Sequence, residues 1–133
     1  MTMREILFRG KHKSSGKWCE GNLHIDKQGI AIITPDDTPL GCYGQVDPDT
    51  VGQYTGLTDK NGTKIFEGDV VHMNSKKFQL SGHGVVVYRN GGFAIDDRKR
   101  NRLYPFMQNG QYNAGDYRVD ENVHDNPELM EGE

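Results

Sequence analysis

The sequence has no apolar run that approaches the roughly twenty residues needed to cross a bilayer. Its first ten residues also lack the long apolar core of a secretory signal peptide. Only 34% of the 133 residues are hydrophobic, and the mean hydropathy is -0.78. This length fits one domain, but the composition leaves it a small core. We therefore expect a soluble, cytoplasmic protein.

The fixed spacings that mark many catalytic and cofactor sites are also absent. There is no Gly-x-Ser-x-Gly, no phosphate-binding glycine loop, no His-Glu-x-x-His and no dinucleotide fingerprint. The five histidines are scattered along the chain, at His12, His24, His72, His83 and His124. His72 and His83 flank the same expected loop and could approach each other. We expect no catalytic residue and no cofactor, with a small hydrolase built from dispersed carboxylates and histidines as the least favoured alternative.

Cysteine is scarce, which limits disulfide and metal chemistry. Cys19 and Cys42 are the only two, and no Cys-x-x-Cys or His-x-x-x-His occurs. Zinc sites usually offer paired ligands at short spacing, so Cys19 with His24 does not support a metal site. Two thiols in a cytoplasmic chain are more often small buried hydrophobes than a disulfide. We expect buried thiols and no bound metal.

The charge balance excludes a global attraction to nucleic acid or anionic lipid. The net charge is -3 and the isoelectric point is near 5.9, so any such binding must be local. One strong basic cluster exists, Arg98, Lys99, Arg100 and Arg102, and the rings of Tyr104 and Phe106 follow it. Clustered cations neutralise phosphates and rings stack on bases, which gives a nucleic-acid-binding hypothesis for Arg98, Lys99, Arg100, Arg102 and Tyr104, or Phe106 in place of Tyr104. A solvated loop is the favoured interpretation.

What the sequence does contain is glycine, short β-branched runs and turn signals, a pattern typical of a mainly β protein. Residues 3–11, 18–25 and 30–34 predict three strands of an N-terminal meander. Residues 35–44 break regular structure, because proline removes a ladder donor and glycine loosens the backbone. Farther on, Asn90-Gly91 predicts a type I′ hairpin in which Tyr88 lies opposite Phe93 and Val86 opposite Ile95. The other face of this hairpin is expected to be partly buried.

The most informative stretch is residues 46–71, a series of turns with apolar anchors. Asp47, Pro48 and Asp49 predict a tight turn in which the aspartates bond nearby backbone amides. Asn61-Gly62 predicts a second type I′ turn, in a hairpin between residues 54 and 66. An EF-hand is excluded, because glycine in its sixth slot would put Gly68 where the closing glutamate belongs. Asp59 and Glu67 are then interpreted as solvated turn carboxylates.

This stretch resembles the signature of the YopX-like family of bacteriophage and prophage proteins. The matching residues are Asp47-Pro48-Asp49-Thr50-Val51-Gly52-Gln53-Tyr54-Thr55-Gly56-Leu57, then Asp59-Lys60-Asn61-Gly62, then Ile65-Phe66-Glu67-Gly68-Asp69-Val70-Val71. Asn126-Pro127-Glu128-Leu129 is similar to the family's closing motif and predicts a short C-terminal helical turn. The family has no established activity, so the resemblance implies a setting, the cytoplasm of a bacterial host cell, rather than a reaction.

Together these features predict one YopX-like domain over residues 1–133, mainly β. Its parts are an N-terminal meander (1–40), the signature turns and hairpin (41–67) and an SH3-like β-barrel or hairpin region (68–133). The favoured function is that of a phage or prophage accessory protein that binds itself or a phage or host protein, rather than an enzyme. Because exposed strand edges are rarely left bare, we also expect a homo-oligomer, with the C-terminal hairpin or the signature loops at its interface.

Overall fold

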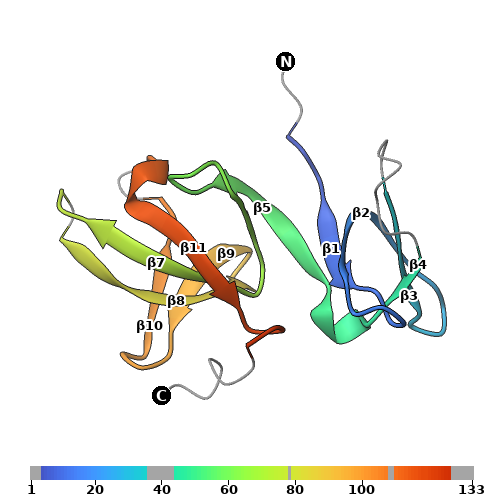
Figure 1. Ribbon diagram of the computed structural model, residues 1–133. Helices are drawn as coiled ribbons and strands as arrows, with labels where there is room; N and C mark the ends of the chain where they lie inside the picture. Colours follow the sequence, from blue (N-terminus) through green and yellow to red (C-terminus); the bar gives the residue numbers. More distant parts are fainter. Residues whose placement is uncertain (1–3, 36–43, 78, 108–109, 127–133) are drawn as a thin grey trace. The chain divides into compact units, whose positions relative to one another are not determined.

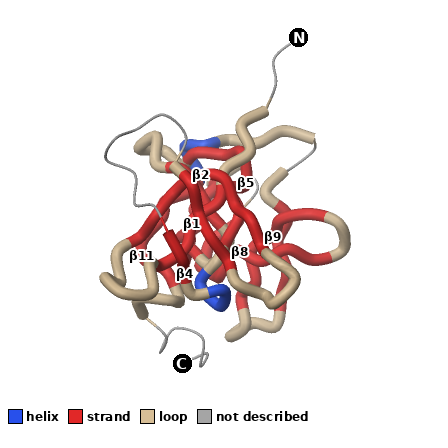
Figure 2. The backbone as a smooth tube through the Cα atoms, turned by 90° about the vertical axis from the view of Figure 1, so that its right-hand side faces the viewer, coloured by secondary structure: helices blue, strands red, loops and turns tan. Residues whose placement is uncertain are grey.

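A computed structural model describes residues 4–35, 44–77, 79–107 and 110–126, and it is almost entirely strands and loops (Figure 1, Figure 2). The expected C-terminal helical turn, which starts at Asn126, therefore lies largely outside the described residues. The chain divides into two compact units, Met1–Gly56 and Leu57–Glu133. The division falls within strand β5 (Gly52–Thr58).

The first unit is an antiparallel sheet built largely from consecutive strands. These are β1 (Phe8–Lys11), β2 (Trp18–Ile25), β3 (Ala31–Thr34) and β4 (Gly44–Val46), in the spatial order β4-β3-β2-β1, with β5 next to β1. The predicted three-stranded meander is confirmed. Its first strand begins later than expected, at Phe8, and Ile6 is 54% exposed. Of the apolar run at residues 6–8, only Phe8 therefore belongs to the strand.

The core of the first unit is small, as the composition predicts. Cys19, Ala31, Ile33 and Val46 are fully buried, and Leu23 and Val51 pack against them. The sheet leads from Val46 into a short 3-10 helix, η1 (Pro48–Thr50). The Asp47 carboxylate accepts a 3.0 Å hydrogen bond from the Asp49 amide, which confirms the predicted turn.

The second unit contains a five-stranded antiparallel sheet. Its strands are β7 (Asp69–Ser75), β8 (Leu80–Arg89), β9 (Gly92–Asp97), β10 (Arg102–Pro105) and β11 (Tyr117–Asn122), in the order β10-β9-β8-β7-β11. A short strand, β6 (Lys64–Phe66), lies next to β5, and the 3-10 helix η2 (Ala114–Asp116) precedes β11. Because β10 and β11 are the two edges, the sheet of the described residues is open, and the predicted SH3-like barrel is not confirmed.

The β8–β9 hairpin agrees with its prediction in turn type and in register. Asn90 and Gly91 both have positive φ, 55° and 83°, as a type I′ turn requires. Tyr88 pairs with Phe93, and their rings meet edge to face at 5.1 Å. Val86 pairs with Ile95 as predicted.

Both faces of this sheet carry apolar side chains. The main core consists of Ile65, Val71, Met73, Val86, Ile95, Phe106 and Tyr117. The opposite face carries a smaller cluster of Val70, Val85 and Val123, with Val87 packed against it. The expected partial burial of the second face is therefore confirmed.

The turn at residues 59–63 differs from its prediction. Gly62 has a φ of 81°, but Asn61 is not among the positive-φ residues, so the turn is not type I′. The Gly62 amide donates to the Asp59 carbonyl, which places Lys60 and Asn61 at the turn centre. Asp59 is only 3% exposed, and its carboxylate accepts from the Asn61 and Thr63 amides at 2.9 Å. The interpretation of Asp59 as a solvated carboxylate is wrong, because its side chain is buried and its carboxylate binds two backbone amides of the turn.

Candidate functional site

The basic cluster lies in the loop between β9 and β10, and a buried carboxylate shapes that loop. Asp97, 6% exposed, accepts a 3.3 Å hydrogen bond from the Arg100 amide through Oδ1. The Asn101 amide donates to the Arg98 carbonyl, and Asn101 adopts a φ of 53°. The loop is therefore a tight turn that presents its cations at a fixed position.

The five predicted site residues do not all line the same space. The Arg98 Nε lies 3.8 Å from the Asp96 carboxylate, which also contacts the Arg89 guanidinium at 3.1 Å. Arg98 does not line the hollow that the others form. Arg98 is therefore set apart from the other four predicted residues, because its guanidinium is paired with Asp96.

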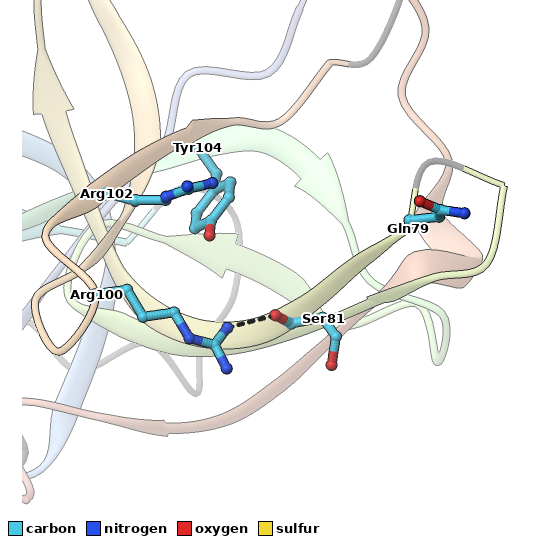
Figure 3. A pocket seen from close by; sticks show the side chains of 5 residues that line it. All are labelled: Gln79, Ser81, Arg100, Arg102 and Tyr104. Atoms are coloured by element: carbon cyan, nitrogen blue, oxygen red, sulfur yellow. Dashed lines mark hydrogen bonds between the residues drawn. The ribbon is translucent and has the colours of Figure 1, made fainter.

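The remaining predicted residues surround a hollow on the second unit. A space of about 520 Å³ is lined by Gln79, Ser81, Arg100, Arg102 and Tyr104 (Figure 3). A second space of about 270 Å³ is lined by Gly82, His83, Asp97, Lys99 and Arg100. Arg100 lines both spaces, so they adjoin, and we call them together the basic hollow. Phe106, the other candidate ring, is 4% exposed and belongs to the core, so it is not available to a ligand.

Two features hold Arg100 in place. Its Nη1 donates a 2.7 Å hydrogen bond to the Ser81 carbonyl, as Figure 3 shows, and lies 3.8 Å from Asp97 Oδ2. Gly82 makes this position possible, since a Cβ there would come within 2.8 Å of the same nitrogen. Arg100 therefore connects the β9–β10 loop to the start of β8.

Several lining residues were not singled out from the sequence as site residues: Gln79, Ser81, Gly82 and Asp97. Ser81 and Gly82 join the site because β8 pairs with β7 as far as Leu80, which carries β8 alongside the basic loop. A possible signal is the Leu-Ser-Gly-His-Gly run, where glycine at residues 82 and 84 indicates close approach of other atoms.

The two histidines that flank the β7–β8 turn do meet. His72 pairs with His83 across the strands, and their rings stack with centroids 6.5 Å apart and planes inclined by 11°. This confirms the expected approach. Arg118 occupies the position opposite His72 on β11, and its Nε donates a 2.7 Å hydrogen bond to Asp120.

The described residues also bear on metal binding and on the state of Cys19. Within the described ranges, no three His, Cys, Asp or Glu side chains are grouped so that they could hold a metal ion. Cys19 is 1% exposed, as predicted, but it takes part in a disulfide bond, so the expectation of a reduced thiol is wrong there. Cys42 lies outside the described residues. The same part of the chain contains no helix with the length and apolar character of a membrane span.

Comparison with known proteins gives a family and a fold. The family described as YopX protein matches residues 7–131, nearly the whole chain. No curated protein matches. Among solved structures, the crystal structure of protein EF1440 from Enterococcus faecalis is similar, with a TM-score of 0.55 and 23% sequence identity, over 96% of this chain and 99% of that one. Since the family match spans nearly all of the sequence, the chain belongs to the YopX family.

Proposed function

We propose that this protein acts by binding rather than by catalysis, and that its ligand is a phosphate-rich polyanion held at the basic hollow. The observation that carries the proposal is the meeting of Lys99, Arg100 and Arg102 at adjoining spaces on a protein of net charge -3. In an acidic protein the attraction must be local, and converging cations supply it.

Two of the three cations are available to a ligand. Within the described part of the chain, no ion pair involves Lys99 or Arg102, whereas Arg100 faces Asp97. Arg102 is exposed at the mouth of the hollow. Each can therefore neutralise a phosphate and release its counterions.

The biological setting of this proposal comes from the family. The YopX-like resemblance implies a phage or prophage accessory protein in the cytoplasm of a bacterial host. A polyanion-binding accessory protein fits that setting.

The test measures binding of fluorescently labelled inorganic polyphosphate by anisotropy at 50 mM and 200 mM salt, about the range over which phosphate contacts weaken steeply. The double variant Lys99→Ser/Arg102→Ser is compared with Lys13→Ser/Lys17→Ser, which removes the same charge from exposed positions of the first unit. We expect the first pair to lower affinity by about tenfold or more and to flatten the slope of log affinity against log salt by about 2. Equal losses in both double variants, or no binding by the parent protein, would contradict the proposal.

Self-association is a second candidate, supported by the edge strand β10. This strand carries Leu103, which is 40% exposed, and among the strands of the described residues it pairs only with β9. Such an edge is a template for another strand.

A further inference from the structure

We infer that the polyanion is single-stranded nucleic acid, bound with one unpaired base against Tyr104 in the larger space and a neighbouring phosphate at Lys99 in the smaller one. This inference rests on the proposed function and adds to it the ligand class and the role of each side chain. Its starting point is the difference between the two adjoining spaces that make up the basic hollow.

The larger space has the character of a base-binding site. Tyr104 packs partly against the main core, so its ring is held in place while one side lines the space. Arg102 stands two residues earlier on the same strand, and side chains two apart share a face of a sheet. A ring beside a guanidinium is the combination on which single-stranded nucleic acids stack their bases.

Polar groups and size complete this part of the site. Gln79 and Ser81 also line this space, and an amide and a hydroxyl can donate to or accept from a base edge. The volume of about 520 Å³ falls within the range of small-ligand sites, about 300 to 1,000 Å³. A base can reach the ring only when it is unpaired, which favours a single strand over a duplex.

The smaller space has no aromatic ring apart from the His83 imidazole, and its free cation is Lys99. An ammonium acts as a point charge toward phosphate and needs no fixed plane. Asp97 stands in the same space, but its carboxylate already accepts from the Arg100 amide and faces the Arg100 guanidinium. A phosphate of the strand is therefore placed toward Lys99.

Arg100 separates the two spaces and has a positioning role. Its guanidinium donates to the Ser81 carbonyl at 2.7 Å and its charge is offset by Asp97 at 3.8 Å. It fixes the loop that carries Lys99 relative to the strand that carries Ser81. The assignment thus separates the stacking residue Tyr104 and the phosphate-binding residues Lys99 and Arg102 from Arg100, which holds the site in shape.

The experiment uses the full chain and three probes: a labelled ten-nucleotide oligothymidylate, the same sequence annealed to its complement, and labelled inorganic polyphosphate. Affinities are measured by anisotropy at 50 mM salt for the parent, Tyr104→Leu, Tyr104→Phe and Lys99→Ser. Tyr88→Leu is the control, because Tyr88 is a 55% exposed tyrosine at the β8–β9 turn and lines neither space. Near-ultraviolet circular dichroism verifies that each variant is folded.

We expect the single strand to bind more tightly than the duplex. Tyr104→Leu should weaken oligothymidylate binding about tenfold and leave polyphosphate binding nearly unchanged, while Tyr104→Phe, which keeps the ring, retains affinity. Lys99→Ser should lower the affinity for both oligothymidylate and polyphosphate. It should also reduce the slope of log affinity against log salt by about 1. If Tyr104→Leu leaves oligothymidylate binding unchanged and polyphosphate binds equally well, the nucleic-acid inference is overturned while polyanion binding stands. If none of the three probes binds, the proposed function falls as well.

Discussion

The carboxylate of Asp59 accepts a 2.9 Å hydrogen bond from the backbone amide of Val119, sixty residues farther along the chain. The same carboxylate accepts from the Asn61 and Thr63 amides. The Lys60 amide in turn donates to the Tyr117 carbonyl. One side chain thus shapes the turn before β6 and ties that turn to β11, an edge strand of the second unit.

Asp59→Ala should therefore destabilise the second unit by about 2 to 3 kcal/mol, since hydrogen bonds to a charged acceptor contribute about 1.5 to 3 kcal/mol each and exposed amides recover part of this from water. Asp59→Asn keeps one acceptor oxygen and should lose about half as much. Urea unfolding followed by the near-ultraviolet signal of the tyrosines, most of which lie in this unit, measures the change. Glu121→Ala, an exposed acid on β11, is the control and should change stability by less than about 0.5 kcal/mol.

The same site predicts a pH dependence. Burial raises the pKa of Asp59, but the amides of Val119, Thr63 and Asn61 and the charge of Lys60 outweigh burial, so its pKa lies below the usual value. A carboxylate with a lowered folded-state pKa stabilises the fold above its unfolded pKa, near 3.9, and this stabilisation is lost as pH falls through the folded pKa. The difference in unfolding free energy between the parent and Asp59→Asn should be constant from pH 7 to about 5 and shrink below about 4. A difference that stays constant down to pH 2, with Glu121→Gln as the reference, would show that folding does not lower the pKa of Asp59.

Close packing at Gly84 gives a prediction about the sheet. A Cβ at this position would lie 2.5 Å from the Asp96 carbonyl oxygen and 2.8 Å from Ile95 Cγ2, and the backbone atom cannot move aside cheaply. Gly84→Ala should destabilise the protein by about 1 to 3 kcal/mol, the usual cost of overpacking. Gly92→Ala, on the neighbouring strand, is the matched control, because nothing lies within 4 Å of its Cβ position. Equal melting temperatures for the two variants would contradict the close approach.

The disulfide at Cys19 predicts a redox-dependent stability of the first unit. Protein purified without reductant should show no reactive thiol at Cys19, even in denaturant. Reduction should lower the stability of the first unit by about 2 to 4 kcal/mol, the usual contribution of a disulfide. The single Trp18 adjoins Cys19 in the sequence, and its emission reports unfolding of this unit. If reductant leaves the unfolding midpoint unchanged, the disulfide does not stabilise the first unit.

Features decided by neighbouring residues were predictable from the sequence. Asn90-Gly91 gave the β8–β9 turn and, with it, the pairing of Tyr88 with Phe93, because type I′ chemistry sets the register locally. The same reasoning failed at Asn61-Gly62. There the Asp59 carboxylate accepts hydrogen bonds from the Asn61 and Thr63 amides, and these bonds favour another turn type. The third donor, the Val119 amide, is sixty residues away in the sequence, so local reasoning could not include it.

The candidate site was predictable only in part, for the same reason. Arg98, Lys99, Arg100 and Arg102 are adjacent in the sequence, and nothing local indicates which of them faces a ligand. Their separation depends on Asp96, which binds Arg98, and on the Ser81 carbonyl, which binds Arg100. Ser81 joins the hollow through strand pairing between β7 and β8, and Gln79 directly precedes β8.

Self-association is the remaining prediction, and it concerns the edge strand β10. Leu103 is 40% exposed on that strand, and natural proteins rarely leave such edges unpaired. Pairing two copies would also add the buried apolar area that a chain with 34% hydrophobic residues lacks.

We expect light scattering at micromolar concentration to give a multiple of 15.0 kDa that decreases on dilution. Leu103→Lys should shift the mass toward the monomer, because a charge on an edge strand disfavours pairing with another strand. Gln28→Lys adds the same charge at an exposed turn of the first unit, outside the C-terminal hairpin and the signature loops, and should leave the mass unchanged. A mass near 15.0 kDa at every concentration would mean that the β10 edge pairs with no second copy and that the polyanion binds to a monomer. The charges of Arg98 and Lys99 next to β10, and of Arg102 on it, would then protect the edge.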